Sequence, residues 1–136
     1  MGLIYAELEL INSGDIELAR RYYIGEEEIK RMHVNALVDT GAYMLCINET
    51  VQEQLDLPLL EMRKGVNANG EVREYKVVGP IEVKFKNRRT LCHAMVLSGD
   101  NEIVLGRTQI LAMDVLVFDN NLIVNPKFPE MAHSRI

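Results

Sequence analysis

The chain has 136 residues, of which 48% are hydrophobic, and a formal net charge of -5. This length and composition predict one domain with a single packed core, and the lack of a block of basic residues argues against a nucleic-acid partner. No apolar run approaches the roughly 20 residues that span a bilayer, so we expect no membrane association. The acidic Glu7 comes too early for a signal peptide, and we therefore expect a cytoplasmic protein.

Short apolar and alternating runs separated by turn signals predict a mostly β chain. In the first part of the chain we expect strands at 3–11 and 29–38, with a turn at 12–15 after the first strand. The segment 15–28 is ambiguous. Its apolar residues fit one helical turn, whereas Tyr22-Tyr23-Ile24-Gly25 favours a strand or a loop.

The middle of the chain predicts a short strand, a helix and a hairpin. The strand at 45–47 should precede a helix that begins at Thr50, because Thr50 and Glu53 have the spacing of a capping box, and Pro58 should stop this helix. The hairpin should turn at Asn67-Ala68-Asn69-Gly70, since Asn-Gly is a strong hairpin signal.

The remaining elements are predicted from similar patterns. The charged run 86–89 is expected to be the solvated tip of a second hairpin. We expect residues 1–126 to form a single domain and residues 127–136 to form a flexible tail. The predicted elements are strands at 77–86, 90–97 and 103–105, a helix at 108–113, and a hairpin of 115–118 with 122–125.

The motif Asp39-Thr40-Gly41-Ala42 directly follows the apolar run 36–38. It places a carboxylate at the end of a buried strand, beside a hydroxyl, and the dry strand end should keep Asp39 desolvated. Gly41 permits close approach of backbone to backbone, and the small Ala42 leaves room for a substrate chain. The same residues also fit an ordinary turn at a strand end.

Peptide hydrolysis by carboxylates needs two of them. Together they activate a water and supply a proton to the leaving nitrogen when one is ionised and the other protonated. The chain holds one Asp-Thr-Gly and no Asp-Ser-Gly. The second carboxylate would therefore be Asp39 of an identical chain, related by a two-fold axis.

Two further features follow the motif in the sequence. The hairpin with Asn67, Ala68, Asn69 and Gly70 at its turn could close over a substrate as a lid. The run 103–107 predicts a buried strand that passes beneath the catalytic loop, where Gly106 permits close approach. Taken singly, these features also fit an ordinary surface hairpin and an ordinary core strand.

With these motifs, residues 3–126 resemble the retropepsin-like aspartic peptidases, in particular their small bacterial relatives. The segment 37–42 matches the catalytic motif, 104–107 matches the motif before the C-terminal helix, and 79–83 resembles the strand after the flap. The resemblance implies a small closed β-barrel with a flap hairpin and one or two short helices. It also implies a homodimer whose active site lies on the two-fold axis.

The resemblance implies roles for individual residues. Asp39, Thr40 and Gly41 would be catalytic, Ala42 and the turn at 67–70 would contact substrate, and Leu105, Gly106 and Arg107 would support the catalytic loop. In the retroviral enzymes an Asp that pairs with this Arg stands where this chain has Tyr43. Arg107 therefore needs another partner, and the segment 12–28 has no counterpart in the family.

We expect an aspartic endopeptidase that binds extended peptides as an added strand and prefers apolar side chains. The alternatives are a catalytically silent binding or dimerisation module on the same fold, and an unrelated small β-barrel. No cofactor or metal is expected. His33 and His93 lack ligand spacing with Cys46 and Cys92, which should be buried thiols in a reducing compartment.

Overall fold

The strands and helices are taken from a computed structural model, which describes residues 2–136. The strands are β1 (Tyr5–Asn12), β2 (Arg31–Val38), β3 (Cys46–Asn48), β4 (Leu59–Val66), β5 (Val72–Phe85), β6 (Arg88–Leu97), β7 (Val104–Leu105), β8 (Val115–Phe118) and β9 (Asn121–Val124). The helices are α1 (Ser13–Arg20), α2 (Glu49–Leu55), α3 (Arg107–Met113) and a short 3-10 turn, η1 (Glu26–Glu28).

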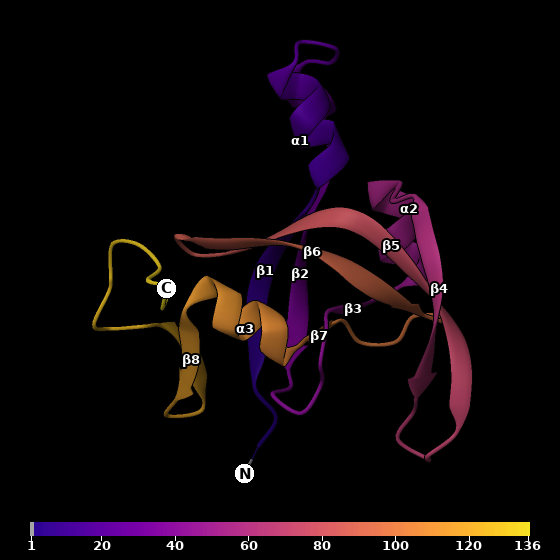
Figure 1. The fold of residues 1–136 in the computed structure, drawn as a ribbon. Coiled ribbons are helices and arrows are strands. Elements are labelled where there is room, and N and C mark those ends of the chain that lie inside the picture. The colour runs from indigo at the N-terminus through magenta and orange to yellow at the C-terminus, as the bar shows by residue number, and fades with distance from the viewer. Residues whose placement is uncertain (1) are drawn as a thin grey trace.

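Seven of the strands within residues 2–136 form one sheet in the order β1-β2-β7-β3-β6-β5-β4 (Figure 1). The second half of β5 also pairs antiparallel with β1, so the sheet closes into a ring and leaves β4 outside as an edge. The β8–β9 hairpin forms a separate small sheet. The predicted mostly β fold with a closed sheet and a hairpin is confirmed, and its described part carries three short α-helices where one or two were expected.

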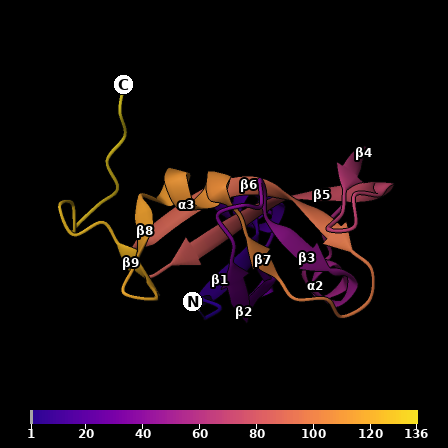
Figure 2. The ribbon, with the colours of Figure 1, turned by 90° about the horizontal axis from the view of Figure 1, so that it is seen from below.

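The core fills the inside of the ring because the strands alternate inward and outward side chains. In β1, Ala6, Leu8 and Leu10 point inward and are buried. In β5 the same alternation buries Ile81 and Val83. The hairpin β4–β5 projects from one side of the ring, while β8–β9 and the C-terminal segment lie on the opposite side (Figures 1 and 2).

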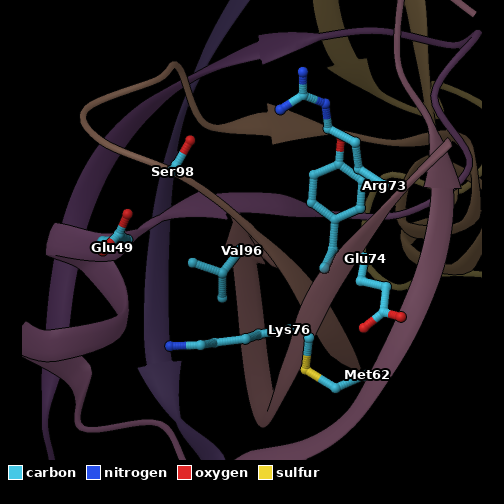
Figure 3. A pocket seen from close by; sticks show the side chains of 8 residues that line it. Glu49, Met62, Arg73, Glu74, Lys76, Val96 and Ser98 are labelled. Carbon is cyan, nitrogen blue, oxygen red and sulfur yellow. The ribbon is translucent and has the colours of Figure 1, made fainter. Parts of the chain in front are cut away.

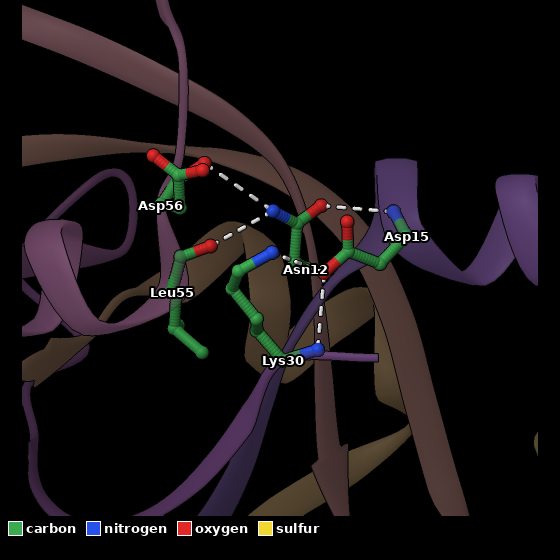
Figure 4. A network of polar contacts seen from close by, with 5 residues as sticks. All are labelled: Asn12, Asp15, Lys30, Leu55 and Asp56. Atoms are coloured by element: carbon green, nitrogen blue, oxygen red, sulfur yellow. Dashed lines mark hydrogen bonds and ion pairs between the residues drawn. The ribbon is translucent and has the colours of Figure 1, made fainter. Parts of the chain in front are cut away.

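The expected turn at 12–15 is wrong, because helix α1 begins at Ser13. The Asn12 side chain caps this helix by accepting a hydrogen bond from the Asp15 N–H at 3.0 Å. The amide of the same side chain donates to the carbonyl of Leu55 at 2.8 Å, and the Asp15 carboxylate accepts from the backbone N–H of Lys30 at 3.0 Å (Figure 4). One buried Asn thus ties α1 to the end of α2.

The expected cap of helix α2 is also wrong by two residues. The Asn48 side chain accepts from the Val51 N–H at 2.9 Å, so Asn48 and not Thr50 caps the helix. The Thr50 hydroxyl donates instead to Asp100 in the loop after β6, at 2.9 Å. The helix ends at Leu55, and its C-cap Asp56, two residues before Pro58, has the left-handed conformation.

The charged run 86–89 was expected to be a solvated tip, and this is wrong for Arg88. The turn comes earlier, at Lys86 and Asn87, and the Arg88 side chain is only 1% exposed. Its guanidinium donates to the carbonyl of Phe128, and the Asn87 amide donates to the carbonyl of Pro129 at 2.9 Å. Charge alone predicted exposure, but the C-terminal segment covers this turn.

The C-terminal segment makes a second contact at the end of α3. His133 donates its backbone N–H to the Asp114 carboxylate at 3.0 Å, its ring nitrogen Nδ1 lies 2.7 Å from the same carboxylate, and its ring stacks on Phe128. The flexibility expected for residues 127–136, and the domain boundary at 126, stay predictions.

Candidate active site

Asp39 is the first residue after β2, and backbone hydrogen bonds on both sides hold it in place. Val38 donates its N–H to the carbonyl of Ile4 at 2.8 Å, and Asp39 donates its N–H to the carbonyl of Leu105 at 3.1 Å. The parallel pairing of β2 with β7 continues up to this point. The carboxylate is therefore carried by a strand end that is fixed to the ring.

The loop after Asp39 folds back on the carboxylate. Gly41 donates its N–H to Asp39 Oδ1 at 2.9 Å, and Ala42 donates its N–H to the Asp39 carbonyl at 3.1 Å. A Cβ at Gly41 would lie 3.2 Å from Asp39 Oδ1, so the missing side chain leaves room for the carboxylate. Asp39, Thr40 and Gly41 are exposed in the single chain, contrary to the expected desolvation of Asp39.

The segment 105–108 crosses against this loop, as the sequence predicted. A Cβ at Gly106 would lie 2.8 Å from the backbone N, C and O atoms of Met44, so no side chain fits there. The N–H of Arg107 donates to the carbonyl of Ala42 at 2.8 Å, and that of Thr108 donates to the carbonyl of Tyr43 at 3.2 Å. The crossing therefore braces the loop through backbone contacts.

The expected partner of Arg107, an Asp in the retroviral enzymes, is replaced here by Tyr43. No other carboxylate of the described residues takes its place. Within residues 2–136 the Arg107 guanidinium forms no ion pair, and its contribution to the loop comes from its backbone N–H. Tyr43 is 61% exposed beside the Asp39 loop. This region of the loop thus presents an aromatic surface where the retroviral enzymes have a charged pair.

A groove of about 490 Å³ separates the Asp39 loop from the β4–β5 hairpin. Gly41 and Ala42 line it from the loop, and Asn67 and Ala68 line it from the turn of the hairpin. Asn69 and Gly70 lie at the same turn but do not line the groove. The structure therefore brings four of the predicted site residues to one cavity next to Asp39.

The floor of this groove was not predicted from the sequence. It is mostly apolar and includes Met44, Cys46, Tyr75, Met95 and Leu97. These residues belong to β3, β5 and β6 and to the segment just before β3, which lie apart in sequence. The pairing of β3 with β6 and of β6 with β5 brings them together. No local pattern marks them. Cys46, Met95 and Leu97 are half-buried on the outer face of their strands, where they alternate with buried core residues.

The turn of the hairpin is organised by one side chain. Asn67 Oδ1 accepts hydrogen bonds from the N–H of Asn69 at 2.9 Å and of Glu71 at 3.0 Å. Gly70 has a φ of 79°, which favours glycine. The Asn-Gly signal in the sequence thus correctly placed the turn that faces the Asp39 loop.

A second hollow, of about 290 Å³, lies on the other face of the hairpin (Figure 3). Met62 and Lys76 from the hairpin, Val96 from β6 and Glu49 from α2 line it. Neither Asp39 nor any residue of its loop reaches this hollow. We therefore place the candidate site in the groove beside Asp39 and not here.

The two cysteines are free thiols and half-buried. Burial, together with the nearby charge of Asp39, raises the pKa of Cys46, and burial raises the pKa of Cys92 to about 12. Thiols held protonated in this way are poor nucleophiles. Among residues 2–136, no three His, Cys, Asp or Glu side chains are placed to hold a metal ion, and no helix is both long and apolar enough to cross a membrane.

Comparison with known proteins gives one family. Residues 26–116 match the model of the family described as "gag-polyprotein putative aspartyl protease". No curated protein matches the chain. The matched segment begins after α1 and contains the Asp39 loop, the hairpin and the crossing at Gly106. The chain therefore belongs to the retropepsin-like aspartyl proteases of the gag-polyprotein type.

Proposed function

We propose that the protein is an aspartic endopeptidase that is active only as a homodimer. The observation that carries this proposal is the loop at Asp39. Its carboxylate is held by the Gly41 N–H, its backbone is braced by the crossing at Gly106, and it lies next to an apolar groove. This is the arrangement needed to present one carboxylate to a peptide bond.

The chain has no second Asp-Thr-Gly or Asp-Ser-Gly to supply the other carboxylate, and three further aspartates are hydrogen-bonded elsewhere. Asp15 accepts from Lys30, Asp100 accepts from Thr50, and Asp114 accepts from His133. A second copy would instead bring its own Asp39 across a two-fold axis. Because Asp39 is exposed in the single chain, it is free to meet that partner.

Exposed apolar side chains beside the Asp39 loop support the same proposal. Tyr43 is 61% exposed, and Leu3, one residue before the carbonyl that binds Val38, is 73% exposed. Large apolar side chains gathered around a functional loop favour contact with another surface. A second copy of the chain would cover them and would remove water from the paired carboxylates.

The chemistry follows from two carboxylates that share one proton, as they do in aspartic proteases generally. The ionised carboxylate takes a proton from a water whose oxygen attacks the peptide carbonyl carbon, and the protonated one gives its proton to the carbonyl oxygen. The tetrahedral diol then returns a proton to the carboxylate pair, the leaving nitrogen receives a proton, and the C–N bond breaks. In this scheme the Gly41 N–H keeps Asp39 oriented throughout.

The direct test replaces Asp39 with Asn. We expect Asp39→Asn to lower peptidase activity at least about a thousandfold, because an amide can neither take nor give the proton, while sedimentation shows the same dimer. Cleavage of a diverse peptide mixture, read by mass spectrometry, measures it. The matched control is Asp119→Asn in the β8–β9 turn, which should cleave like wild type. Surviving activity in Asp39→Asn would overturn the mechanism.

Acid pH should favour activity. A pair of facing carboxylates works when it holds one proton, and raising the pH removes that proton. We expect kcat/KM for a fixed peptide to fall as the pH rises from 5 to 8. A rate that still increases above neutral pH would argue for a different catalytic group.

A further inference from the structure

We propose that Arg63 binds an acidic side chain of the substrate and so selects for it. In the substrate sequence, this acidic residue would stand two positions from the apolar residue whose side chain lies on the groove floor. This inference rests on the proposed peptidase function and adds a substrate feature to it. Arg63 lies in β4, on the hairpin strand that faces the Asp39 loop.

Arg63 stands where two hollows meet. It lines the groove of about 490 Å³, and with Tyr43 and Met44 it also lines an adjoining hollow of about 270 Å³ that extends toward Thr108 and Gln109. Among the described residues that line the groove, Arg63 is the only one that carries a charge. Its guanidinium is therefore the positive charge available to a ligand in this groove, while the nearby negative charge is that of Asp39.

The guanidinium is available for a ligand. Arg63 Nη1 lies 3.8 Å from the Met44 sulfur, which is a weak acceptor. Arg63 Nη2 lies 3.6 Å from Glu61 Oε1, and the two side chains are 49% and 52% exposed. Such an exposed pair adds little stability. A substrate carboxylate could bind the planar guanidinium through two parallel hydrogen bonds and replace this contact.

The position of the acidic residue follows from the geometry of an extended peptide. Side chains on one face of a strand are two residues, or roughly 6–7 Å, apart. Arg63 lines both hollows, and Cys46 and Met95 line only the larger one. With one apolar side chain on the floor at Cys46 and Met95, we expect the next side chain on that face to reach Arg63. The intervening side chain points away, so its charge should matter little.

Lys76 provides a matched control on the same hairpin. It pairs with Met62 in the register of β4 and β5, one residue along from the pair of Arg63 with Tyr75. Neighbouring residues of a strand face opposite sides, and Lys76 lines the other hollow with Met62 (Figure 3). Lys76→Glu therefore changes the charge of the hairpin as much as Arg63→Glu does, but outside the groove.

The test measures peptide binding to the Asp39→Asn protein, in which peptides stay intact. Fluorescein-labelled ten-residue peptides carry a central Leu-Met pair among Ala and Ser, with Glu, Gln or Lys placed at each other position in turn, and fluorescence anisotropy gives Kd. At one position, two residues from the Leu or the Met, we expect Glu to bind about tenfold more tightly than Gln, and this ratio should shrink as salt rises.

Two substitutions test whether Arg63 causes the preference for Glu. Arg63→Glu should reverse the preference, so that Lys binds more tightly than Glu at that position, and Lys76→Glu should keep the wild-type preference. An equal response of Glu and Gln peptides in the Asp39→Asn protein, or a preference that survives Arg63→Glu, would overturn the role of Arg63. Binding is measured without cleavage, so the two proposals can fail separately. A wild-type protein that cleaves none of these peptides would contradict the peptidase proposal, whereas the role of Arg63 is judged from the binding data alone.

Discussion

The two walls of the groove are built in different ways. The wall that carries Asp39 is fixed by backbone contacts, since Gly106 approaches the Met44 backbone too closely for any side chain and Arg107 donates to the Ala42 carbonyl. The opposite wall is the β4–β5 hairpin. Its strand β4 is exposed along its length and pairs, among the described strands, with β5 alone.

The boundary between the hairpin wall and the rigid ring lies within the single strand β5. The first part of β5, from Val72 to Lys76, is largely exposed in the hairpin, whereas inward-facing residues from Val77 onward are buried and residues 81–84 pair with β1. A catalytic group must be held to a fraction of an ångström, whereas a lid must move to admit and release substrate. The fold thus assigns these two demands to opposite walls.

The largest difference should come from the same substitution placed on each wall. Gly106→Ala forces a methyl group into the Met44 backbone, and we expect it to lower the free energy of unfolding by roughly 2–3 kcal/mol and to abolish cleavage. Gly70→Ala, at the tip of the hairpin with a φ of 79° and open space around it, should cost only about 1 kcal/mol. Urea unfolding measures both, and equal costs would break the comparison.

A second pair of substitutions tests the two halves of β5. Val78 is completely buried and Val72 is 64% exposed. Val78→Ala should lower the free energy of unfolding by about 2 kcal/mol, since it removes buried methyl groups and leaves a cavity. Val72→Ala should change it by less than about 0.5 kcal/mol. A large loss of stability in Val72→Ala would mean that the hairpin is packed more firmly than the exposed strand indicates.

Narrowing the groove at Gly65 should have a smaller effect, on activity more than on stability. A Cβ at Gly65 would lie 3.0 Å from the Tyr75 ring and 3.1 Å from the Met95 methyl group. Both are side-chain atoms that can shift, so Gly65→Ala should leave stability within about 1 kcal/mol while adding a methyl group to the lining of the groove. We expect kcat/KM to fall more for peptides with Phe on the floor than for those with Ala. A uniform fall would contradict this.

The smallest effect concerns the end of α3, which anchors the fixed wall. Hydrogen bonds from His133 lower the pKa of the Asp114 carboxyl to about 2 from its ordinary value of 3.8. Because the folded pKa is the lower one, the contact stabilises the fold above about pH 4 and is lost as the pH falls toward 2.

Asp114→Asn should therefore unfold at lower temperature than wild type at pH 6, and the two melting temperatures should converge as the pH approaches 2. His133→Ala should converge in the same way but with a smaller difference at pH 6, because it removes the ring nitrogen while the backbone N–H still donates to the Asp114 carboxylate. A difference in melting temperature that stays constant with pH would show that Asp114 acts only through its role as the left-handed cap of α3.

Much of the active-site wall could be predicted from the sequence because it is local. Asp39, Gly41 and Gly106 mark positions where backbone meets backbone, and such positions demand particular residues. The Asn-Gly turn at 69–70 is equally local, since its conformation depends on the residues within it. These signals do not need knowledge of distant partners.

The features that were missed depend on distant partners. The ambiguity at 15–28 arose because exposed tyrosines at the end of α1 resemble strand residues, and only the Asn12 contacts with Leu55 and Asp15 reveal the helix cap. Arg88 was expected in solvent because no neighbouring residue in the sequence indicates that its guanidinium donates to the distant carbonyl of Phe128. The groove floor and the place of Arg63 depend on the order in which β3, β6, β5 and β4 pair in the sheet.

The central claim is that two Asp39 carboxylates act as one catalytic unit, and mixing subunits tests it most directly. Wild-type and Asp39→Asn chains are combined at constant total concentration and allowed to exchange, and cleavage is measured against the wild-type fraction. If each site needs both carboxylates, activity falls as the square of the wild-type fraction. If one carboxylate per chain suffices, activity falls in direct proportion to that fraction, and the shared site is contradicted.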